Sequence, residues 1–284
     1  MTYILFNPHA NNGNGAEGAE LVKAALADRS PELCDLTAID VKAFLEGLTA
    51  EDRVILCGGD GTLNRLVNDL DGVCPDVPIH VWRFGTGNDF LRDVAGDGPD
   101  AQTVLLNGYI KNLPCVELGG ERRYFLNGCG AGVDALVCKR MNEDRGKKPS
   151  YIATAIRSFF KDFKTTTARV TVDGETRTYD RVWMAGALNG RYQGGGMLFA
   201  PDQDRRSDKL CCFVWHGTGP LGTLLCFPSI MKGKHTRYTK YCDIRFGREI
   251  TVELGDAHFV QFDGETVSDI TRLTIRKQGD VHDR

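Results

Sequence analysis

The stretch that decides the fold is Val54-Ile55-Leu56-Cys57-Gly58-Gly59-Asp60-Gly61-Thr62-Leu63-Asn64. Its four apolar residues have the length of a buried strand, and the glycine-rich turn after them leads into a helical run. The same order of strand, turn and helix recurs before and after this stretch. Strand, turn and helix repeating at this spacing predict a parallel sheet with helices on both faces.

The other elements expected in the first hundred residues follow the same pattern. The expected strands are Tyr3–Phe6, Asp35–Ile39, Arg53–Cys57 and Ile79–Phe84, and the expected helices are Ala16–Ala27, Val41–Leu48 and Thr62–Leu70. This part of the chain is therefore predicted to be an α/β domain over residues 1–112.

After about residue 110 the pattern changes to short alternating runs, which are typical of antiparallel strands. The runs are Val170–Val172, Val182–Leu188, Leu210–Trp215, Ile244–Phe246, Ile250–Leu254, Phe259–Phe262 and Leu273–Ile275. They predict a second, mainly antiparallel domain over residues 113–284, with a few helices. Its last strand or tail could return to the first domain.

Composition excludes several classes of protein. The chain has 284 residues, of which 42% are hydrophobic and 26% charged, so it is neither disordered, collagenous nor a coiled coil. The net charge of -3 argues against a nucleic-acid-binding protein. This charge is uneven: residues 1–100 hold 17 acidic and seven basic residues, whereas the remainder holds 21 acidic and 28 basic residues. The second part is thus suited to an anionic partner.

The location expected from the sequence is cytoplasmic. No apolar run approaches the roughly 20 residues of a spanning helix, and the N-terminus lacks the features of a signal peptide. The ten cysteines are scattered without a Cys-x-x-Cys pair, which indicates reduced thiols rather than disulfides or a zinc site.

Three glycine-rich turns each follow an expected strand, at residues 7–15, 58–62 and 85–89. The carboxyl ends of parallel strands share one edge of a sheet, where ligands bind. Backbone N–H groups and helix N-termini gathered there suit phosphate groups. A dinucleotide site at Gly13-Asn14-Gly15-Ala16-Glu17-Gly18 is the rival interpretation. It is weaker, because six residues separate the strand from Gly13 and the other two turns would stay unexplained.

Several of these motifs resemble those of one protein family. Gly58-Gly59-Asp60-Gly61-Thr62-Leu63-Asn64 is similar to the nucleotide-binding signature of diacylglycerol kinases, sphingosine kinases and related bacterial lipid kinases. Gly85-Thr86-Gly87-Asn88-Asp89 resembles that family's second signature, and Asn7-Pro8 with Gly13 and Gly15 its first loop. Gly130–Ala135, Gly194–Met197 and Asp263-Gly264-Glu265 also fit, in family order.

The resemblance implies a fold with a nucleotide-binding α/β domain and a β-sandwich lipid-substrate domain. It also implies transfer of the γ-phosphoryl group of ATP to a lipid hydroxyl, with diacylglycerol as the expected acceptor and Mg²⁺ as cofactor. It implies Glu265 as the general base, with Asp263 beside it, and Asp60 with Asp89 as ligands of the catalytic Mg²⁺. The implied ATP-binding positions are Asn7, Pro8, Gly13, Gly15, Thr37, Gly58, Gly59, Asp60, Gly61, Thr62, Asn64, Gly85, Thr86, Asn88 and Asp89.

Bacterial members of this family also have a structural Mg²⁺ site. Carried over to this chain, its ligands would be the Asp208 carboxylate and the carbonyl oxygens of Arg205 and Leu210. The chain departs from the family at two positions, since Lys209 replaces the usual Gly and Arg65 the usual Glu. Arg65 is either an exposed residue of no consequence or a change toward a different lipid headgroup.

A lipid kinase must reach a bilayer, so we expect reversible, peripheral membrane association. Tyr151–Lys164 has apolar residues on one helical face and basic residues on the other, which fits either an interfacial helix or, more commonly, docking on the domain core. Basic residues also gather in Lys232–Arg248. A homodimer is possible, and no motif supports nucleic-acid binding.

Other functions remain open at this point. The acceptor could be phosphatidylglycerol, a sphingoid base or a soluble metabolite, because NAD kinases share a similar GGDGT loop. The protein could also be a non-catalytic lipid- or nucleotide-binding regulator, given the departures at Arg65 and Lys209.

Overall fold

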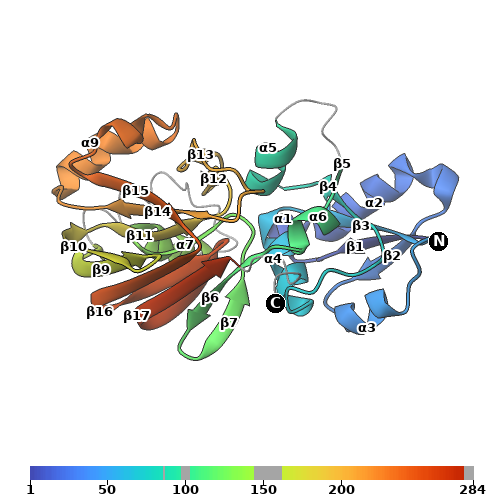
Figure 1. Ribbon diagram of the computed structural model, residues 1–284. Coiled ribbons are helices and arrows are strands. Elements are labelled where there is room, and N and C mark those ends of the chain that lie inside the picture. Colours follow the sequence, from blue (N-terminus) through green and yellow to red (C-terminus); the bar gives the residue numbers. More distant parts are fainter. Residues whose placement is uncertain (86, 97–102, 144–161, 278–284) are drawn as a thin grey trace. The chain divides into compact units, whose positions relative to one another are not determined.

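The computed structural model describes residues 1–85, 87–96, 103–143 and 162–277 (Figure 1). The chain divides into two compact units, Met1–Leu113 and Pro114–Arg284, which we call the first and the second unit. Each unit has its own sheet and its own buried core.

The first unit is built on a five-stranded sheet in the order β2-β1-β3-β4-β5. Its strands are β1 (Thr2–Phe6), β2 (Glu32–Asp35), β3 (Arg53–Gly58), β4 (Ile79–Arg83) and β5 (Thr103–Leu105). Its helices are α1 (Ala10–Gly13), α2 (Gly15–Ala25), α3 (Val41–Glu46), α4 (Asp60–Asp69), α5 (Asp89–Ala95) and α6 (Asn107–Ile110), with a short 3₁₀ turn at Ala27–Arg29. Strands β1 to β4 are parallel, which confirms the predicted α/β architecture.

Two strands of this sheet differ from the prediction. The strand expected at Asp35–Ile39 lies instead at Glu32–Asp35. It ends there because the Asp35 carboxylate accepts hydrogen bonds from the backbone N–H and the hydroxyl of Thr37, both at 2.7 Å, and so turns the chain. Strand β5 was not expected, and it pairs antiparallel to β4. Its three residues are too few to show a period.

Alternating residues of the central strands form the core of the first unit. Ile4 of β1 and Ile55 and Cys57 of β3 pack against Ala19 and Val22 of α2. All five side chains are at most 3% exposed. This packing holds the carboxyl ends of β1 and β3 side by side, in register from Thr2 with Arg53 to Phe6 with Cys57.

The second unit is a mainly antiparallel sheet that folds around its core, as predicted. The strands of this sheet are β6 (Pro114–Leu118), β7 (Glu121–Tyr124), β8 (Gly128–Gly132), β9 (Thr166–Val172), β10 (Glu175–Val182), β11 (Met184–Leu188), β14 (Leu210–Trp215), β15 (Cys242–Gly247), β16 (Glu249–Phe262) and β17 (Glu265–Lys277). Strands β12 (Tyr192–Gln193) and β13 (Met197–Leu198) pair with each other in a separate two-stranded sheet. Among the described residues of the second unit, the helices are α7 (Val133–Glu143), α9 (Pro220–Ile230) and the 3₁₀ turn η3 (Lys234–Arg237).

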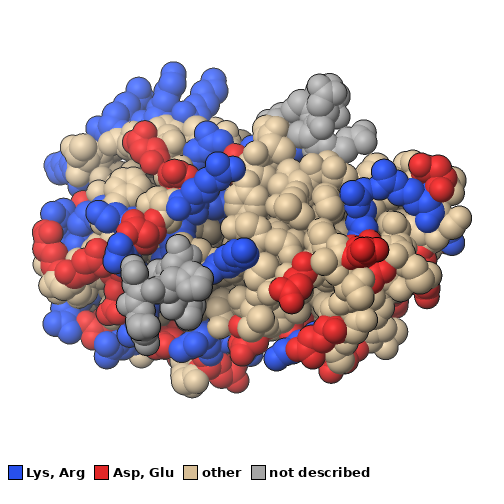
Figure 2. All heavy atoms as spheres, turned by 45° about the vertical axis from the view of Figure 1, so that its right-hand side comes forward, with Lys and Arg blue, Asp and Glu red and all other residues tan. Residues whose placement is uncertain are grey.

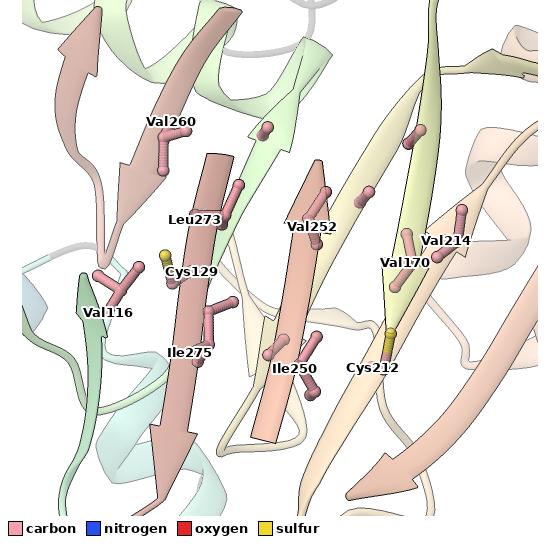
Figure 3. Close-up of a cluster of buried hydrophobic side chains, with 14 of the residues drawn as sticks. Val116, Cys129, Val170, Cys212, Val214, Ile250, Val252, Val260, Leu273 and Ile275 are labelled. Carbon is pink, nitrogen blue, oxygen red and sulfur yellow. The ribbon is translucent and has the colours of Figure 1, made fainter. Parts of the chain in front are cut away.

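Strand β16 joins the two parts of this sheet. Its first half pairs with β9 and its second half with β8, with register shifts between Glu253 and Val260. The sheet therefore folds over, and apolar side chains from strands far apart in sequence meet inside it (Figure 3). Val170 of β9, Val214 of β14 and Ile275 of β17 are all fully buried there.

The run predicted as one strand from Val182 to Leu188 is two strands. β10 ends at Val182, β11 begins at Met184, and Trp183 between them donates its indole N–H to the Thr218 carbonyl. The last strand, β17, pairs with β16 and β6 and so belongs to the second unit. The ten cysteines are all free.

Candidate functional site

The three glycine-rich turns follow β1, β3 and β4, which are neighbours in the first sheet. Because these strands are parallel, the turns lie at one edge of the sheet, as predicted. The sheet order also reverses here, since β1 has β2 on one side and β3 on the other. Ligands of open α/β sheets bind at the carboxyl ends of strands at such a reversal.

Asp60 joins two of these turns. It is the first residue of α4, after β3, and its carboxylate bonds the start of α5, after β4. Oδ2 accepts a hydrogen bond from the backbone N–H of Asp89 at 2.8 Å, and Oδ1 one from Phe90 at 3.0 Å. A Cβ on Gly87 would lie 3.0 Å from Oδ2, so the turn leaves little room for a side chain there. One carboxylate thus holds the two nucleotide-signature segments together.

The backbones of the same two turns pack closely. A Cβ on Gly85, whose φ is +132°, would lie 3.4 Å from the Cα of Gly59. Asn88 adopts a left-handed conformation with φ of 50° and donates its side-chain amide to the Gly85 carbonyl at 2.7 Å. The Oδ1 atom of Asn88 is buried, and no described residue donates a hydrogen bond to it. An acceptor of this kind at the sheet edge is available to a ligand.

The first loop also uses glycine for close packing. A Cβ on Gly15 would lie only 1.9 Å from the carbonyl oxygen of Asn7, so α2 can begin against β1 only with glycine there. The Asn7 side chain accepts the backbone N–H of His9 at 3.0 Å. By contrast, Cβ atoms on Gly13 or Gly61 would meet nothing within 4 Å. Among the described glycines of the three turns, these two keep open space for an approaching ligand.

Two of the predicted ATP-binding residues are buried in α4. Thr62 and Asn64 are each 3% exposed. A Cβ on Gly58 would lie 2.5 Å from the Thr62 side chain, and the side-chain oxygen of Asn64 accepts the Asn68 amide at 3.3 Å. The Thr62 side chain therefore packs against the turn, and the Asn64 side chain is bonded within α4. Thr86 lies outside the described residues.

Two residues of interest lie near the carboxyl end of β2: Thr37, which follows the strand, and Arg65 of α4, which reaches the segment after it. The Thr37 hydroxyl is bound to Asp35. Arg65 donates to the carbonyl oxygen of Leu36 at 3.3 Å and pairs with Asp69 at 3.3 Å. Arg65 thus ties α4 to the segment after β2, a structural role that neither of its two sequence interpretations included.

Asp89 completes the acidic pair at this edge. It is 4% exposed, and its Oδ1 lies 3.4 Å from a guanidinium nitrogen of Arg92, one turn later in α5. The carboxylates of Asp60 and Asp89 and the amide oxygen of Asn88 are hard oxygen donors, which are the ligands that Mg²⁺ takes. Asp60, Asn88 and Asp89 therefore place oxygen atoms of the kind that Mg²⁺ takes at one edge of the first sheet.

The second unit contains Asp263 and Glu265 on the β16–β17 hairpin. Asp263 and Gly264 form its two-residue turn, with φ of 48° and 95°, between the paired Phe262 and Glu265. The Asp263 carboxylate accepts three backbone N–H groups where the chain enters β8, from Leu126 at 2.6 Å, Asn127 at 2.8 Å and Gly128 at 3.1 Å.

Asp263 is therefore an anchor for the hairpin, and Glu265 is the exposed carboxylate beside it. Asn142 of α7 fixes the turn from the other side by donating to the Gly264 carbonyl at 3.0 Å. Glu265 is the first residue of β17, so its backbone is set by the sheet while its side chain stays accessible. This arrangement suits a proton acceptor better at Glu265 than at Asp263.

Asp134 is a further carboxylate that sequence reasoning did not assign. Gln193 and Gln261 donate to its Oδ2 at 3.3 Å and 3.2 Å, and its buried Oδ1 has no partner among the described residues. Burial raises the pKa of Asp134 to about 6. It borders a cavity of about 20 Å³, room for one water molecule, which also touches Phe199 and Phe213.

The proposed structural Mg²⁺ ligands do not fit a divalent ion. The carbonyl oxygen of Arg205 accepts a hydrogen bond from the Lys277 ammonium at 2.7 Å. The Asp208 carboxylate pairs with the guanidinium of Arg248, which lowers the pKa of Asp208. Two positive side chains thus already occupy two of the three expected ligands, and like charges this close oppose a further cation. We assign no metal there.

The alternation of inward and outward side chains along β17 is the sequence feature that could have indicated the buried position of Lys277. Leu273 and Ile275 face the core, and the next inward position is Lys277, which is 5% exposed. Its ammonium also donates to the Asn189 side chain at 2.8 Å. Burial, with Arg205 nearby, lowers the pKa of Lys277 to about 8. A lysine on the apolar face of a strand predicts such a buried polar network.

Most of the segment considered for membrane contact, Tyr151–Lys164, lies outside the described residues. Within its described end, Phe163 stacks on Trp183 at 5.6 Å and packs on the core of the second unit. In the part of the chain that the structure describes, no helix is both long and apolar enough to span a bilayer.

The comparisons with known proteins agree with this geometry. Residues 1–118 match the diacylglycerol kinase catalytic domain, and residues 128–276 match the YegS C-terminal NAD kinase beta sandwich-like domain. The two matches cover both units. The chain therefore belongs to the diacylglycerol kinase-like family of lipid kinases, a family of phosphotransferases.

Individual relatives are distant in sequence. A diacylglycerol kinase of Mycobacterium tuberculosis is 26% identical over 245 residues, which cover 81% of this chain and 78% of that protein. A Bacillus subtilis protein named "putative lipid kinase YtlR" is 26% identical over 264 residues, covering 83% and 84%. A solved structure from Bacillus anthracis, titled a "putative diacylglycerol kinase", superposes with a TM-score of 0.70 at 21% identity, covering 99% and 93%, and shows the shared fold.

Proposed function

We propose that this protein is an ATP- and Mg²⁺-dependent lipid kinase that phosphorylates a lipid hydroxyl, with diacylglycerol as acceptor and phosphatidic acid as product. Family membership supports lipid phosphorylation, and the diacylglycerol kinase of Mycobacterium tuberculosis is the relative that supports this acceptor. The observation that carries the proposal is the Asp60 carboxylate, which joins the two signature turns through the amides of Asp89 and Phe90.

In the first unit, ATP binding would use the sheet edge. The open approaches beside Gly13 and Gly61 let phosphate oxygens reach backbone N–H groups at the starts of α2 and α4. The unpartnered Oδ1 of Asn88 can accept an N–H group of the nucleotide or an O–H group. These residues bind and orient, which is most of what phosphoryl transfer requires of a protein.

Asp60 and Asp89 would hold Mg²⁺, directly or through water. When bound, the ion would neutralise charge on the phosphate oxygens. Asp60 keeps its orientation because both its oxygens are fixed by N–H groups of α5. Arg92 beside Asp89 adds a positive charge near the same edge.

Proton removal from the acceptor hydroxyl would fall to Glu265. Its side chain is exposed, whereas the Asp263 carboxylate is committed to three backbone amides. Asp263 would act as a positioning residue, because it holds the hairpin that presents Glu265.

The test is phosphate transfer from labelled ATP to a panel of acceptors presented separately: diacylglycerol, phosphatidylglycerol, a sphingoid base and NAD. Labelled phosphatidic acid is the expected product. Another labelled lipid would move the acceptor assignment, labelled NADP would point to a soluble acceptor, and no product from any acceptor would favour a binding protein.

The role of Glu265 is tested in the same assay. Glu265→Gln should lower turnover by about 10²–10⁴-fold with ATP affinity retained. The matched control is Asp269→Asn on the same strand, whose exposed left-handed position suits Asn as well as Asp. Equal turnover in Glu265→Gln and wild type would refute the role.

A further inference from the structure

Helix α9 of the second unit presents an apolar surface to solvent. Residues 220–230 read Pro-Leu-Gly-Thr-Leu-Leu-Cys-Phe-Pro-Ser-Ile and include no charged residue. Leu221 is 62% exposed and Leu225 72%, and Met231, directly after the helix, is 48% exposed. A surface helix ordinarily turns a polar face to water, so exposed leucines along such a helix indicate an interaction site.

The opposite face of α9 explains how this surface is held. Ile230 is buried in the core, and Cys226 and Phe227 pack against it. The start of the helix is fixed by a hydrogen bond between the hydroxyls of Thr223 and Thr218. The helix is therefore docked by one face, and the outward leucines are not needed for that docking.

Positive charge flanks the apolar surface. No Asp or Glu occurs from Leu210 to Cys242, whereas Lys232, Lys234, Arg237 and Lys240 follow the helix and are all exposed. None of these four forms an ion pair with a carboxylate of the described residues. Figure 2 shows Lys and Arg side chains crowded at the upper left, at the height where α9 lies in Figure 1.

Two tyrosines lie at the junction of the apolar and basic parts. The Arg237 guanidinium stands 4.8 Å from the ring centre of Tyr238, and the Lys240 ammonium 5.6 Å from that of Tyr241. Both rings also pack on the core of the second unit. Tyrosine, with an apolar body and a polar tip, is favoured where an apolar phase meets water.

We propose that α9 with Met231–Lys240, named here the α9 patch, docks this protein on the surface of an anionic lipid bilayer. Leu221, Leu225 and Met231 enter the interface, and the four cations meet the headgroups. The combination of exposed apolar residues with unpaired cations matches an anionic membrane surface. A second copy fits poorly, because a two-fold contact would bring the same cations together.

The proposed function explains why the protein would bind a bilayer, since an enzyme that acts on a lipid must reach it, and the inference rests on that function in this respect alone. Binding itself needs neither ATP nor turnover, so it can be measured apart from the chemistry. The α9 patch differs from Tyr151–Lys164, the helical segment considered from the sequence, and includes part of the basic run Lys232–Arg248.

The experiment is sedimentation of the full chain, without ATP, with vesicles of phosphatidylcholine alone or mixed with phosphatidylglycerol. The wild type should bind the mixed vesicles and lose binding as salt rises. Lys232→Gln with Lys234→Gln should lower the partition coefficient about 25-fold, at about fivefold for each cation. Leu221→Gln with Leu225→Gln should lower it by at least about tenfold.

Matched controls come from the first unit. Leu21 is 63% exposed and Lys23 is exposed on the same helix, α2, so Leu21→Gln with Lys23→Gln changes equally accessible residues. These controls should bind as the wild type does. Thermal unfolding of all variants should match the wild type, because the changed side chains are exposed.

Several results would overturn the α9 patch. Wild-type vesicle binding by both patch variants would do so, as would equal loss in the controls. A wild-type dimer that the leucine variant converts to monomer, with vesicle binding unchanged, would assign the surface to self-association instead. If no lipid is phosphorylated by the wild type, the proposed function fails, while the α9 patch stands or falls on sedimentation alone.

Discussion

Replacing Lys277 by methionine tests whether internal cations take the place of a structural metal. The Lys277 ammonium donates to Asn189 at 2.8 Å and to the Arg205 carbonyl at 2.7 Å, in a region where Lys277 itself is 5% exposed. Methionine has a similar length but no donor, so both buried acceptors would lose their partner. Each such loss costs about 1–3 kcal/mol.

The net cost of Lys277→Met should lie at the lower end of the summed range. Methionine removes the cost of burying an ammonium group, which offsets part of the lost hydrogen bonding. We expect the free energy of unfolding of the second unit to fall by about 2–3 kcal/mol. Arg248→Gln is the contrasting variant, because the Arg248–Asp208 pair is exposed and should change stability little.

Tryptophan fluorescence during urea unfolding can report on the second unit selectively. Trp183 and Trp215 are each 2% exposed and lie in this unit, whereas Trp82, the remaining tryptophan, lies in the first. A Trp82→Phe background therefore isolates the required signal. In that background, EDTA and added Mg²⁺ should give the same unfolding midpoint.

Two results would refute this reasoning. One is an unfolding free energy for Lys277→Met equal to that of the wild type. The other is stabilisation of the wild-type second unit by Mg²⁺, which would amount to about 2.7 kcal/mol at a hundred times the dissociation constant of a bound ion. The second result would show that the ion displaces the Lys277 and Arg248 contacts and that the family's structural site is present.

Three further predictions concern single residues. Gly15→Ala should lower both thermal stability and ATP affinity, because its Cβ would lie 1.9 Å from the Asn7 carbonyl oxygen. Gly61→Ala should keep the stability of the wild type, because a Cβ there meets nothing within 4 Å. Equal melting temperatures for the two variants would contradict this reasoning. Asp263→Ala should lower the free energy of unfolding of the second unit, measured in urea, by about 3 kcal/mol or more, because three backbone amides lose a charged acceptor. Loss of activity at unchanged stability would instead indicate a direct catalytic role for Asp263. The pKa of Asp134 is raised to about 6, so the folded state holds this proton more tightly than the unfolded chain does. The free energy of unfolding should therefore fall by up to about 3 kcal/mol as pH rises from about 4 to about 7. Asp134→Asn should lack this fall, and an equal fall in both proteins would refute the raised pKa of Asp134.

The α/β architecture of the first unit was predictable because its signals are local. An apolar run as short as Val54–Cys57, followed by a glycine-rich turn, marks the end of a strand without any knowledge of the partner strand. The wrongly predicted bounds of β2 also have a local cause. Asp35 and Thr37 form a turn that ends β2 earlier than its apolar residues suggest.

The strands of the second unit were predictable where one face is apolar. Leu210–Trp215 was found with its observed bounds because all six of its residues are buried. Strand β10, Glu175–Val182, was missed since only Tyr179 and Val182 along it are buried. The double pairing of β16 was also missed, because it depends on which strands lie on either side.

For the candidate site, the sequence located Asp60, Asp89 and Glu265 through their motifs and left their partners open. It could not foresee that Asp263 serves as an anchor, since that role depends on the segment Leu126–Gly128. It also pointed to metal at Arg205, where the structure places an ammonium.

The sequence by itself determined the order of the elements and the glycine turns at strand ends, because apolar period and turn chemistry act over a few neighbouring residues. Only the tertiary structure decided which polar groups meet. Asp60 binds an amide 29 residues away, Asp263 one 137 residues away, and Lys277 a carbonyl 72 residues away. Such contacts depend on strand register, in which a shift by one residue turns a side chain to the opposite face of the sheet.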